Sequence, residues 1–339
     1  MNRPFLSVEN LVVHFPTSDG VVRATEGLSY TLERGKTLGI VGESGSGKSV
    51  SSSAILGLHR GTSAKVGGEI WLDGSELLGL DDDEIRNRRG KDVAMIFQDP
   101  LSALHPYFRI GDQIGEAYLA HNRVTKRAAR ARTIEMLARV GIPNPDRRVD
   151  DYPHQFSGGM RQRVMIAMAL INDPTLLIAD EPTTALDVTV QAQILDLLQD
   201  LQREFNTALI MITHDLGVIA EVADDVLVMY AGRAVEYGSV RDLLTTPAMP
   251  YTWGLIQSVP DVTRSVDLPL RPIPGNPPSL LNPPGGCPFF ARCEYSQFVE
   301  GDRCSTELPA LRTVSPGHSK RCHLENAVAT YDVVEVGAN

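Results

Sequence analysis

The sequence predicts an α/β fold around a mostly parallel sheet. A short apolar run at residues 37–41 ends in a glycine-rich turn and is followed by a helical stretch from Val50, the pattern of a strand that leads into a helix. Residues 6–15 alternate apolar and polar side chains like an amphipathic strand. Strands buried on both faces of a parallel sheet are almost continuously apolar, and four further runs have this composition: residues 93–97, 176–179, 208–213 and 226–230.

Two regions depart from this pattern. No strand is predicted between residues 100 and 162, and residues 126–140 place apolar side chains at helical spacing, which indicates a helical insertion. Residues 259–288 contain prolines too densely for a regular helix or central strand, so we expect an extended connector there. We predict one large domain at residues 1–258, with a helical subdomain at about 100–162, and a second region at 259–339 that holds the connector and all four cysteines.

The composition argues against several classes of protein. The 339 residues include 42 acidic and 32 basic ones, and the resulting net charge of −10 disfavours a broad nucleic-acid-binding surface. The basic stretch at residues 126–132 is expected to be a solvated helix face. No segment approaches the roughly 20 apolar residues that span a bilayer, and residues 1–12 lack the features of a secretory signal. We therefore expect a globular, non-exported protein that contacts a membrane only through a partner.

The glycine-rich turn matches the phosphate-binding loop pattern. Glycines allow successive backbone N–H groups to point at phosphate oxygens, and the N-terminus of the following helix adds partial positive charge. In this pattern Lys48 contacts the β- and γ-phosphates of ATP, and the Ser49 hydroxyl binds Mg²⁺. The residues predicted to bind the nucleotide here are Gly42, Ser44, Gly45, Ser46, Gly47, Lys48 and Ser49.

Two carboxylates and a histidine follow later strands of the predicted sheet. Asp180 and Glu181 end the apolar run at residues 176–179, and we predict that Asp180 holds Mg²⁺ while Glu181 polarises the attacking water. His214 follows the strand predicted at residues 208–213 and is expected to reach the γ-phosphate, because ligands of doubly wound sheets bind at the edge where strands end.

Between these motifs lies a segment similar to the signature sequence of the ABC ATPase family. It contains Ser157, Gly158 and Gly159 ahead of an apparent helix, and it has Met160 where the family more often has glutamine. The resemblance implies a phosphate-loop NTPase (RecA-like) core sheet with an ABC-type β subdomain, the inserted helical subdomain and a small cysteine-containing C-terminal extension. It also implies that the signature faces a nucleotide held by an opposite subunit, so that two ATP molecules are sandwiched between two ATPase domains.

Three further positions match motifs of this family. Gln98 resembles the glutamine that senses Mg²⁺ and the membrane partner, and Asp187 lies in a segment that resembles the dimer-contact loop. Phe15 resembles the aromatic residue that stacks on adenine, although a core aromatic is an almost equally good interpretation. The resemblance therefore implies Glu181, His214 and Gln98 as catalytic residues, and Ser49, Gln98 and Asp180 around Mg²⁺.

Within this family the chain resembles the oligopeptide and dipeptide importer ATPases. The segments that carry this resemblance are residues 98–106, 152–156, 187–193, 230–233 and 250–255. It implies ATP-driven peptide uptake at the cytoplasmic face of the cell membrane, with two transmembrane permease subunits, an extracytoplasmic solute-binding protein and a second ATPase subunit, a heterodimer being favoured. Import of nickel or oligosaccharides by the same machinery, and a soluble ABC ATPase with a redox-sensing tail, are the alternatives.

The cysteines allow several interpretations. The cysteines could form two disulfides, which a reducing compartment disfavours, or a zinc site, which commonly uses more closely spaced pairs. They could also hold an iron–sulfur cluster, or remain unligated thiols that pack in the core. The tail resembles the C-terminal segment of peptide importers, some of which hold a 4Fe–4S cluster, and this resemblance favours the cluster. His323 is an alternative ligand beside the four predicted ones, Cys287, Cys293, Cys304 and Cys322.

Overall fold

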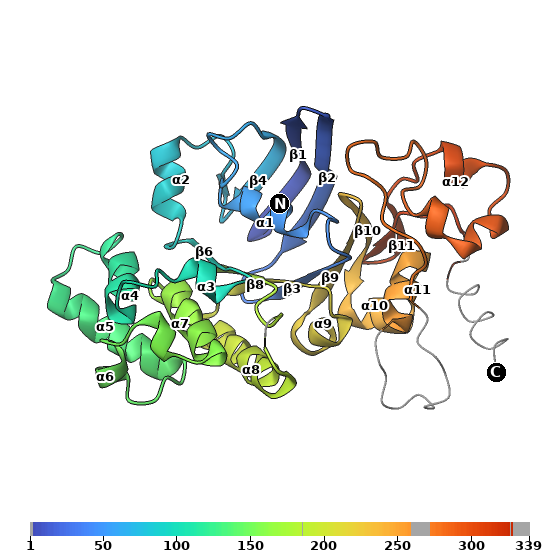
Figure 1. The fold of residues 1–339 in the computed structure, drawn as a ribbon. Helices are drawn as coiled ribbons and strands as arrows, with labels where there is room; N and C mark the ends of the chain where they lie inside the picture. Colours follow the sequence, from blue (N-terminus) through green and yellow to red (C-terminus); the bar gives the residue numbers. More distant parts are fainter. Residues whose placement is uncertain (1–2, 185, 259–271, 326, 328–339) are drawn as a thin grey trace. The chain divides into compact units, whose positions relative to one another are not determined.

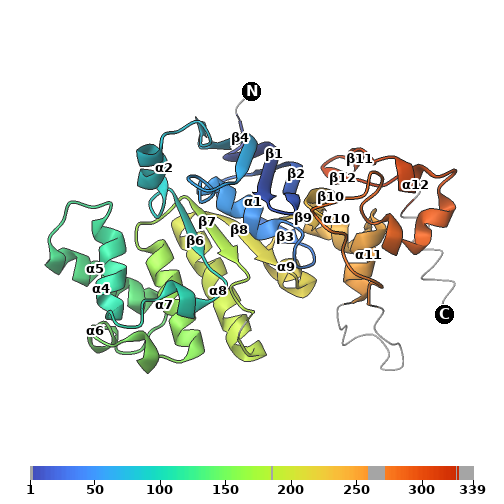
Figure 2. The same ribbon diagram turned by 45° about the horizontal axis from the view of Figure 1, so that its top comes forward.

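The computed structural model describes residues 3–184, 186–258, 272–325 and 327. The chain divides into two compact units (Figures 1 and 2): unit 1 comprises residues 1–31, 38–78 and 213–339, and unit 2 comprises residues 32–37 and 79–212. The domain boundary after residue 258 stays a prediction, and residues 259–271 of the expected connector lie outside the described part. None of the helices described is long and apolar enough to span a bilayer.

Unit 1 begins with a four-stranded sheet in the order β2-β1-β4-β5, in which β1 pairs antiparallel with β4. The alternation predicted for the first strand is visible in β1, where Leu11 and Val13 are buried while Asn10 is exposed. The register of the β1–β4 pair shifts between Glu9 and Val12. The strands are β1 (Leu6–Thr17), β2 (Gly20–Leu32), β4 (Lys65–Leu72) and β5 (Ser75–Glu76).

The second group of strands in unit 1 follows the order β11-β12-β10-β9-β3. Strand β3 runs parallel to β9, whereas β10 pairs antiparallel with both β9 and β12. The five residues of β3 are all buried, as expected of a strand covered on both faces. The strands are β3 (Thr37–Val41), β9 (Asp225–Tyr230), β10 (Arg233–Ser239), β11 (Arg312–Ser315) and β12 (His318–Lys320).

The helices of unit 1 are short. Helix α1 begins directly after the glycine-rich turn, and the side chain of Asp215 caps the N-terminus of α9. They are α1 (Lys48–Ile55), α9 (Leu216–Val222), α10 (Val240–Thr245), α11 (Pro250–Gln257), α12 (Arg303–Thr306) and the 3₁₀ helices η2 (Phe290–Arg292) and η3 (Glu294–Phe298).

The last strands of the chain are anchored to β10. Glu236 of β10 lies opposite Lys320 of β12 in the ladder, and its fully buried carboxylate contacts the His318 imidazole at 2.7 Å. The same oxygen accepts a hydrogen bond from the Ala248 N–H at 2.6 Å. A buried carboxylate needs such partners, and His318 of the cysteine-containing region supplies one of them, while the other oxygen, Oε2, is buried without a hydrogen-bond partner among the described residues.

Unit 2 contains the parallel strands β6, β7 and β8, with helices α4, α5 and α6 grouped to one side of them (Figure 2). Its elements are α2 (Asp82–Arg88), β6 (Val93–Ile96), α3 (Pro100–Ala103), α4 (Ile110–Leu119), α5 (Lys126–Arg139), α6 (Pro145–Arg148), η1 (Pro153–Gln155), α7 (Gly158–Leu170), β7 (Leu176–Asp180), α8 (Val188–Phe205) and β8 (Ala208–Thr213). Residues 100–162, where no strand was predicted, contain only helices, turns and bends.

The predicted α/β class is confirmed. The predicted strands at residues 37–41 and 208–213 have the same bounds as β3 and β8, and the other apolar runs match β6, β7 and β9 to within one residue. The first predicted strand, at residues 6–15, is two residues longer in the structure. Strand β7 ends at Asp180, so the predicted pair Asp180 and Glu181 lies at the end of a strand.

Candidate functional site

The loop between β3 and α1 takes a course that only glycine permits at two positions. Gly42 and Gly47 have φ angles of 152° and 97°, which residues with a side chain rarely adopt. A Cβ atom at Gly42 would overlap the backbone carbonyl of Met229, and one at Gly47 would overlap that of Ala24. The chain thus curls tightly against two neighbouring strands before α1 begins.

Lys48 and Ser46 present polar groups within this loop. Lys48 is buried, and its Nζ donates hydrogen bonds to the carbonyl oxygens of Gly42 and Glu43 at 2.7 and 3.0 Å. The Ser46 Oγ is also buried and has no hydrogen-bond partner among the described residues. A buried hydroxyl without a partner, a lysine and a helix N-terminus suit a ligand with several anionic oxygens, so these residues fit a triphosphate. Three other residues predicted to bind the nucleotide are exposed in the loop: Ser44, Gly45 and Ser49.

In unit 2 the structure brings together two of the predicted catalytic residues. The Glu181 carboxylate accepts hydrogen bonds from the side chains of Gln98 and Thr184, at 3.0 and 2.9 Å. Its backbone has a φ of 46° and donates its N–H to the Ile212 carbonyl oxygen at 2.9 Å. Asp180 beside it is buried, with 9% of its surface exposed. The contact with Thr184 was not predicted, because it depends on the turn that follows β7.

His214 lies in unit 1 and is exposed directly after β8. The next residue, Asp215, accepts hydrogen bonds from the N–H groups of Gly217 and Val218 at the start of α9. The strand end and the following helix therefore fix the backbone beside His214. Its contact with a γ-phosphate stays a prediction.

Two further predicted residues cap helices of unit 2. The Ser157 hydroxyl accepts a hydrogen bond from the Met160 N–H, and the helix expected after this segment is α7, which already begins at Gly158. Asp187 caps α8 in the same way, through the Val190 N–H at 3.0 Å. A Cβ on Gly158 would enter open space, whereas one on Gly159 would collide with the Val190 side chain. The role of these residues in binding a second nucleotide stays a prediction.

Phe15 packs near the helix that follows the phosphate loop. Its ring is half-buried in β1 and makes an edge-to-face contact with the His59 ring, with centroids 5.5 Å apart. His59 in turn contacts the Ser53 hydroxyl of α1 at 3.0 Å. Stacking of Phe15 on adenine stays a prediction.

The four cysteines are free thiols that line one small cavity in unit 1. Burial, with a smaller contribution from the neighbouring cysteines, raises the pKa of both Cys287 and Cys293 to about 12. The described residues include no group of three His, Cys, Asp or Glu side chains placed to hold a single metal ion. The proposed alternative ligand His323 instead contacts the Glu307 carbonyl oxygen at 2.9 Å.

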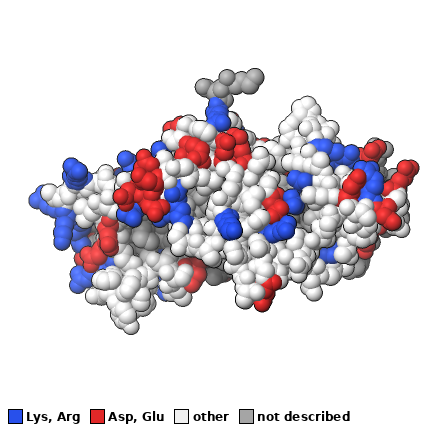
Figure 3. All heavy atoms as spheres, turned by 90° about the horizontal axis from the view of Figure 1, so that it is seen from above, with Lys and Arg blue, Asp and Glu red and all other residues white. Residues whose placement is uncertain are grey.

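The basic stretch at residues 126–132 lies in α5 and is paired with carboxylates. Arg130 forms two hydrogen bonds to Asp150, at 2.9 and 2.7 Å, which lower the pKa of that carboxyl group. Arg132 contacts Asp173 at 2.6 Å. Figure 3 shows basic side chains at the left of the view with acidic ones beside them. This arrangement agrees with the predicted solvated helix face.

Two residues that contact the phosphate loop were missed. Arg292, from the cysteine-containing region, forms an ion pair with Glu43 of the loop, and the Tyr251 hydroxyl accepts the Glu43 N–H. The signal for Arg292 was present in the sequence, because a cationic residue between two cysteines in an otherwise apolar segment needs a buried partner. The partner itself lies 249 positions away and has no local signal.

Two family models match the chain. The model described as "ABC transporter" matches residues 25–184, which include the phosphate loop, the Ser157–Gly159 segment and the acidic pair. The model described as "Oligopeptide/dipeptide transporter, C-terminal region" matches residues 235–298, which include β10, α11 and Arg292. Together they confirm the resemblance predicted from the motifs.

Curated relatives match nearly the whole chain. The dipeptide transport ATP-binding protein DppD of Bacillus subtilis is 51% identical over 330 residues, covering 97% of each chain. The oligopeptide transport ATP-binding protein OppD of Salmonella typhimurium is 51% identical over 317 residues, covering 94% of this chain and 92% of the relative. Among solved structures, the dimeric post-hydrolysis state of the ATP-binding cassette MJ0796 bound to ADP and Pi is 27% identical, with a TM-score of 0.62, and covers 70% of this chain and 99% of that chain.

Proposed function

Since the chain belongs to the family of ATP-binding subunits of ABC-type oligopeptide and dipeptide transporters, we propose that it hydrolyses ATP to drive the uptake of peptides. The observation that carries this proposal is the match of relatives named for peptide transport over both the ATPase region and the C-terminal region. Nickel or oligosaccharide import and a soluble ABC ATPase are not favoured by these relatives.

We propose that the loop at residues 42–49 holds the phosphates of ATP. Lys48 contacts the β- and γ-phosphates, the backbone N–H groups of the loop surround the phosphate oxygens, and Phe15 stacks on the adenine. Ser49, Gln98 and Asp180 hold Mg²⁺, which when bound neutralises charge that develops on the transferred phosphate. The partnerless Ser46 hydroxyl and the buried Lys48 support this assignment.

Glu181 is proposed to polarise the water that attacks the γ-phosphate. The hydrogen bonds from Gln98 and Thr184 support this role, because they orient the carboxylate before the substrate is bound. His214 is proposed to contact the γ-phosphate from the end of β8. Phosphoryl transfer requires an aligned nucleophile and compensated charge more than covalent chemistry; Glu181 would align the water, and His214 would help to compensate the charge on the γ-phosphate.

The active form is proposed to be a dimer of ATPase subunits, with a heterodimer favoured. In this dimer Ser157, Gly158 and Gly159 face the nucleotide bound by the partner subunit, and Asp187 contacts the dimer interface. The start of α7 supports this, because the uncapped N–H groups of a first helical turn and the positive end of the helix dipole suit a phosphate. ATP binding closes the dimer and hydrolysis reopens it.

The partners proposed are two transmembrane permease subunits and an extracytoplasmic solute-binding protein, with this chain at the cytoplasmic face of the membrane. A reconstituted transporter containing all subunits should take up labelled di- and oligopeptides when ATP is supplied, and peptide-loaded binding protein should stimulate hydrolysis. Nickel and an oligosaccharide serve as competing solutes. Uptake of either competitor, with none of peptide, would overturn the proposed substrate class.

We also propose that the four-cysteine cavity holds a 4Fe–4S cluster. Four free thiols that line one cavity support this proposal, because a 4Fe–4S cluster is commonly held by four cysteine thiolates. Its proposed role is to stabilise the C-terminal region. Protein purified without oxygen should contain about four iron atoms per chain. A colourless, iron-free protein with full ATPase activity would rule the cluster out.

A further inference from the structure

Arg292 carries a buried charge that the roles assigned above do not use. It stands at the end of η2, between Cys287 and Cys293, and only 5% of its side chain is exposed. Its Nη1 and Nη2 atoms donate to the two carboxylate oxygens of Glu43, at 2.5 and 3.0 Å. Glu43 is the second residue of the phosphate loop. The cysteine-containing region and the loop, both in unit 1, are therefore joined by a two-pronged ion pair.

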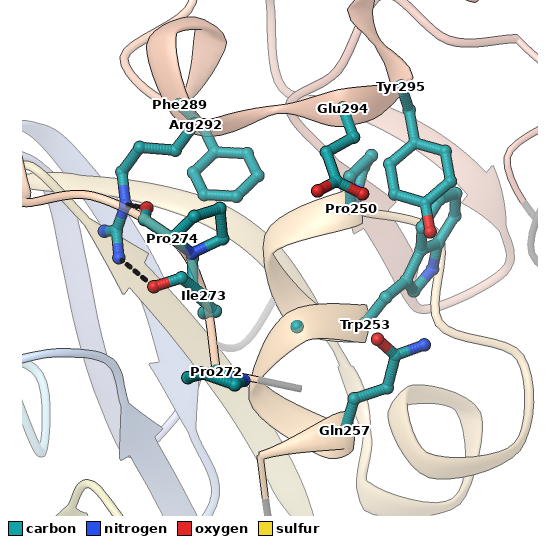
Figure 4. Close-up of a pocket in the computed structure, with 11 residues that line it drawn as sticks. Pro250, Trp253, Gln257, Pro272, Ile273, Pro274, Phe289, Arg292, Glu294 and Tyr295 are labelled. Atoms are coloured by element: carbon teal, nitrogen blue, oxygen red, sulfur yellow. Dashed lines mark hydrogen bonds between the residues drawn. The ribbon is translucent and has the colours of Figure 1, made fainter. Parts of the chain in front are cut away.

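The remaining donors of Arg292 fix the guanidinium in place. Nε donates to the Pro274 carbonyl oxygen at 2.7 Å, and Nη2 reaches the Ile273 carbonyl oxygen at 3.3 Å (Figure 4). Nη1 also donates to the Tyr230 hydroxyl at 3.2 Å. A guanidinium has five N–H donors in a rigid fork, and nearly all of them have acceptors here. Arg292 is thus a fixed cation and not a mobile surface charge.

Glu43 is held at its backbone as well as at its carboxylate. Its N–H donates to the Tyr251 hydroxyl at 2.8 Å, and its carbonyl oxygen accepts from the Lys48 Nζ at 3.0 Å. Tyr251 is fully buried and packs against the rings of Tyr230 and Phe289, with centroids 4.6 and 5.3 Å apart. The one residue Glu43 therefore links Arg292 and Tyr251 to the lysine of the phosphate loop.

Two physical consequences follow for a bound triphosphate. A loop rich in glycine loses much conformational entropy when it is ordered around a ligand, and anchoring Glu43 beforehand removes part of that cost. In addition, the carboxylate of Glu43 would repel phosphates if it stood alone in the loop. Arg292 neutralises it at hydrogen-bonding distance, and the hydrogen bond between them raises the pKa of the guanidinium, so Arg292 stays charged.

We propose that Arg292 is a positioning residue of the nucleotide site: by fixing and neutralising Glu43, it sets the phosphate loop in its ATP-binding form. This inference rests on the proposed ATPase function. It assigns to the C-terminal region a role in nucleotide binding that is exerted through Glu43, beyond any stabilising role of its cysteines.

The test measures the affinity of the full-length chain for a fluorescent ATP analogue. Arg292→Gln is expected to weaken binding about tenfold or more, since it leaves an unpaired, partly buried carboxylate beside the phosphates. Adding Glu43→Gln to that variant should restore most of the affinity, because the repelling charge is removed. In the assembled transporter Arg292→Gln should raise the KM for ATP and leave kcat nearly unchanged.

Arg321→Gln is the matched control. The Arg321 side chain also anchors the C-terminal region, through the carbonyl oxygens of Ala234 and Pro309, but it does not contact the loop. Equal losses in Arg292→Gln and Arg321→Gln, or no recovery in the double variant, would overturn the inference. If Arg292→Gln does not fold, Arg292→Lys is tested instead. We expect its affinity for the ATP analogue to fall a few-fold, and wild-type affinity would overturn the inference.

The design separates this inference from the proposed function. Lys48→Ala should weaken analogue binding at least about tenfold whether or not Arg292 is also replaced. If the wild-type chain itself binds no ATP, the proposed function fails. If the wild type binds ATP and Arg292→Gln binds it equally well, only the role of Arg292 fails.

Discussion

The Gln98 side-chain amide donates a hydrogen bond to the Glu181 carboxylate across 3.0 Å, although the two residues are 83 positions apart in the chain. Thr184 supplies a second donor, and the Ile212 carbonyl oxygen holds the backbone N–H of Glu181. The carboxylate is therefore oriented by groups from three different segments of unit 2. Its orientation does not depend on a bound substrate.

Replacing Glu181 with Gln should abolish turnover while ATP remains bound. The amide cannot polarise water as a carboxylate does, and we expect kcat to fall by at least about 100-fold. Steady-state hydrolysis and equilibrium binding of ATP, measured on the same preparation, check this. Glu204→Gln is the control, because Glu204 pairs with Arg139 on the surface and should leave the rate unchanged. Hydrolysis at the wild-type rate would refute the assignment of Glu181.

Replacing Gln98 with Ala should lower kcat about tenfold, since one of the two side-chain donors that orient Glu181 is lost. Binding of ATP in the absence of Mg²⁺ should change little. Pre-steady-state phosphate release, with Gln297→Ala as an exposed control, measures the effect. An unchanged kcat together with a weakened ATP affinity would show that Gln98 acts on binding instead.

Replacing Lys48 with Ala should weaken ATP binding at least about tenfold, because a buried cation in the loop is removed. The matched control is Lys91→Ala, which removes an exposed lysine of unit 2. Titration with a fluorescent analogue and thermal unfolding together separate a loss of binding from a loss of folding. Equal ATP affinities in both variants would contradict the role of the loop.

In iron-free folded protein, Cys287 and Cys293 should react with iodoacetamide at pH 8 roughly 1,000-fold more slowly than in unfolded protein. Burial raises their pKa from the model-peptide value of 9.0 to about 12, and the reactive thiolate becomes tenfold rarer for each unit. The sign follows from the chemistry: a raised thiol pKa favours the neutral form, so reactivity and the linked loss of stability should rise between about pH 9 and 12. Mass spectrometry of the labelled peptides, with urea-unfolded chain as the reference, measures this. Fast labelling of the folded chain at pH 8 would show that the cavity is open to solvent.

The strands that the sequence predicted are those buried on both faces. Residues 37–41 and 208–213 are continuously apolar because helices and neighbouring strands cover them, so composition alone marks their ends. Strand β11 was missed because all four of its residues are exposed, so its pairing partner defines it more than its own composition does. Strand β2 was also missed, although its residues 28–32 alternate between buried and exposed side chains.

The candidate site likewise contains residues that the sequence predicted and residues that it did not. Glycines, the lysine and the acidic pair were predictable because each motif is local and its chemistry requires fixed spacing. The pairing of Arg292 with Glu43 was not, since it depends on how residues 249 positions apart meet after folding. Thr184 was missed for a related reason: only the turn after β7 brings its hydroxyl to Glu181.

The antiparallel pairing of β12 with β10 has consequences for folding during synthesis and for truncated forms of the chain. Residues 318–320 leave the ribosome about 80 residues after β10, yet they pair with that strand and supply the imidazole that contacts the buried Glu236. Until they arrive, β10 has an open edge that can pair with another polypeptide. A fragment that stops after α11 would keep every motif for phosphate chemistry and would still be prone to aggregate.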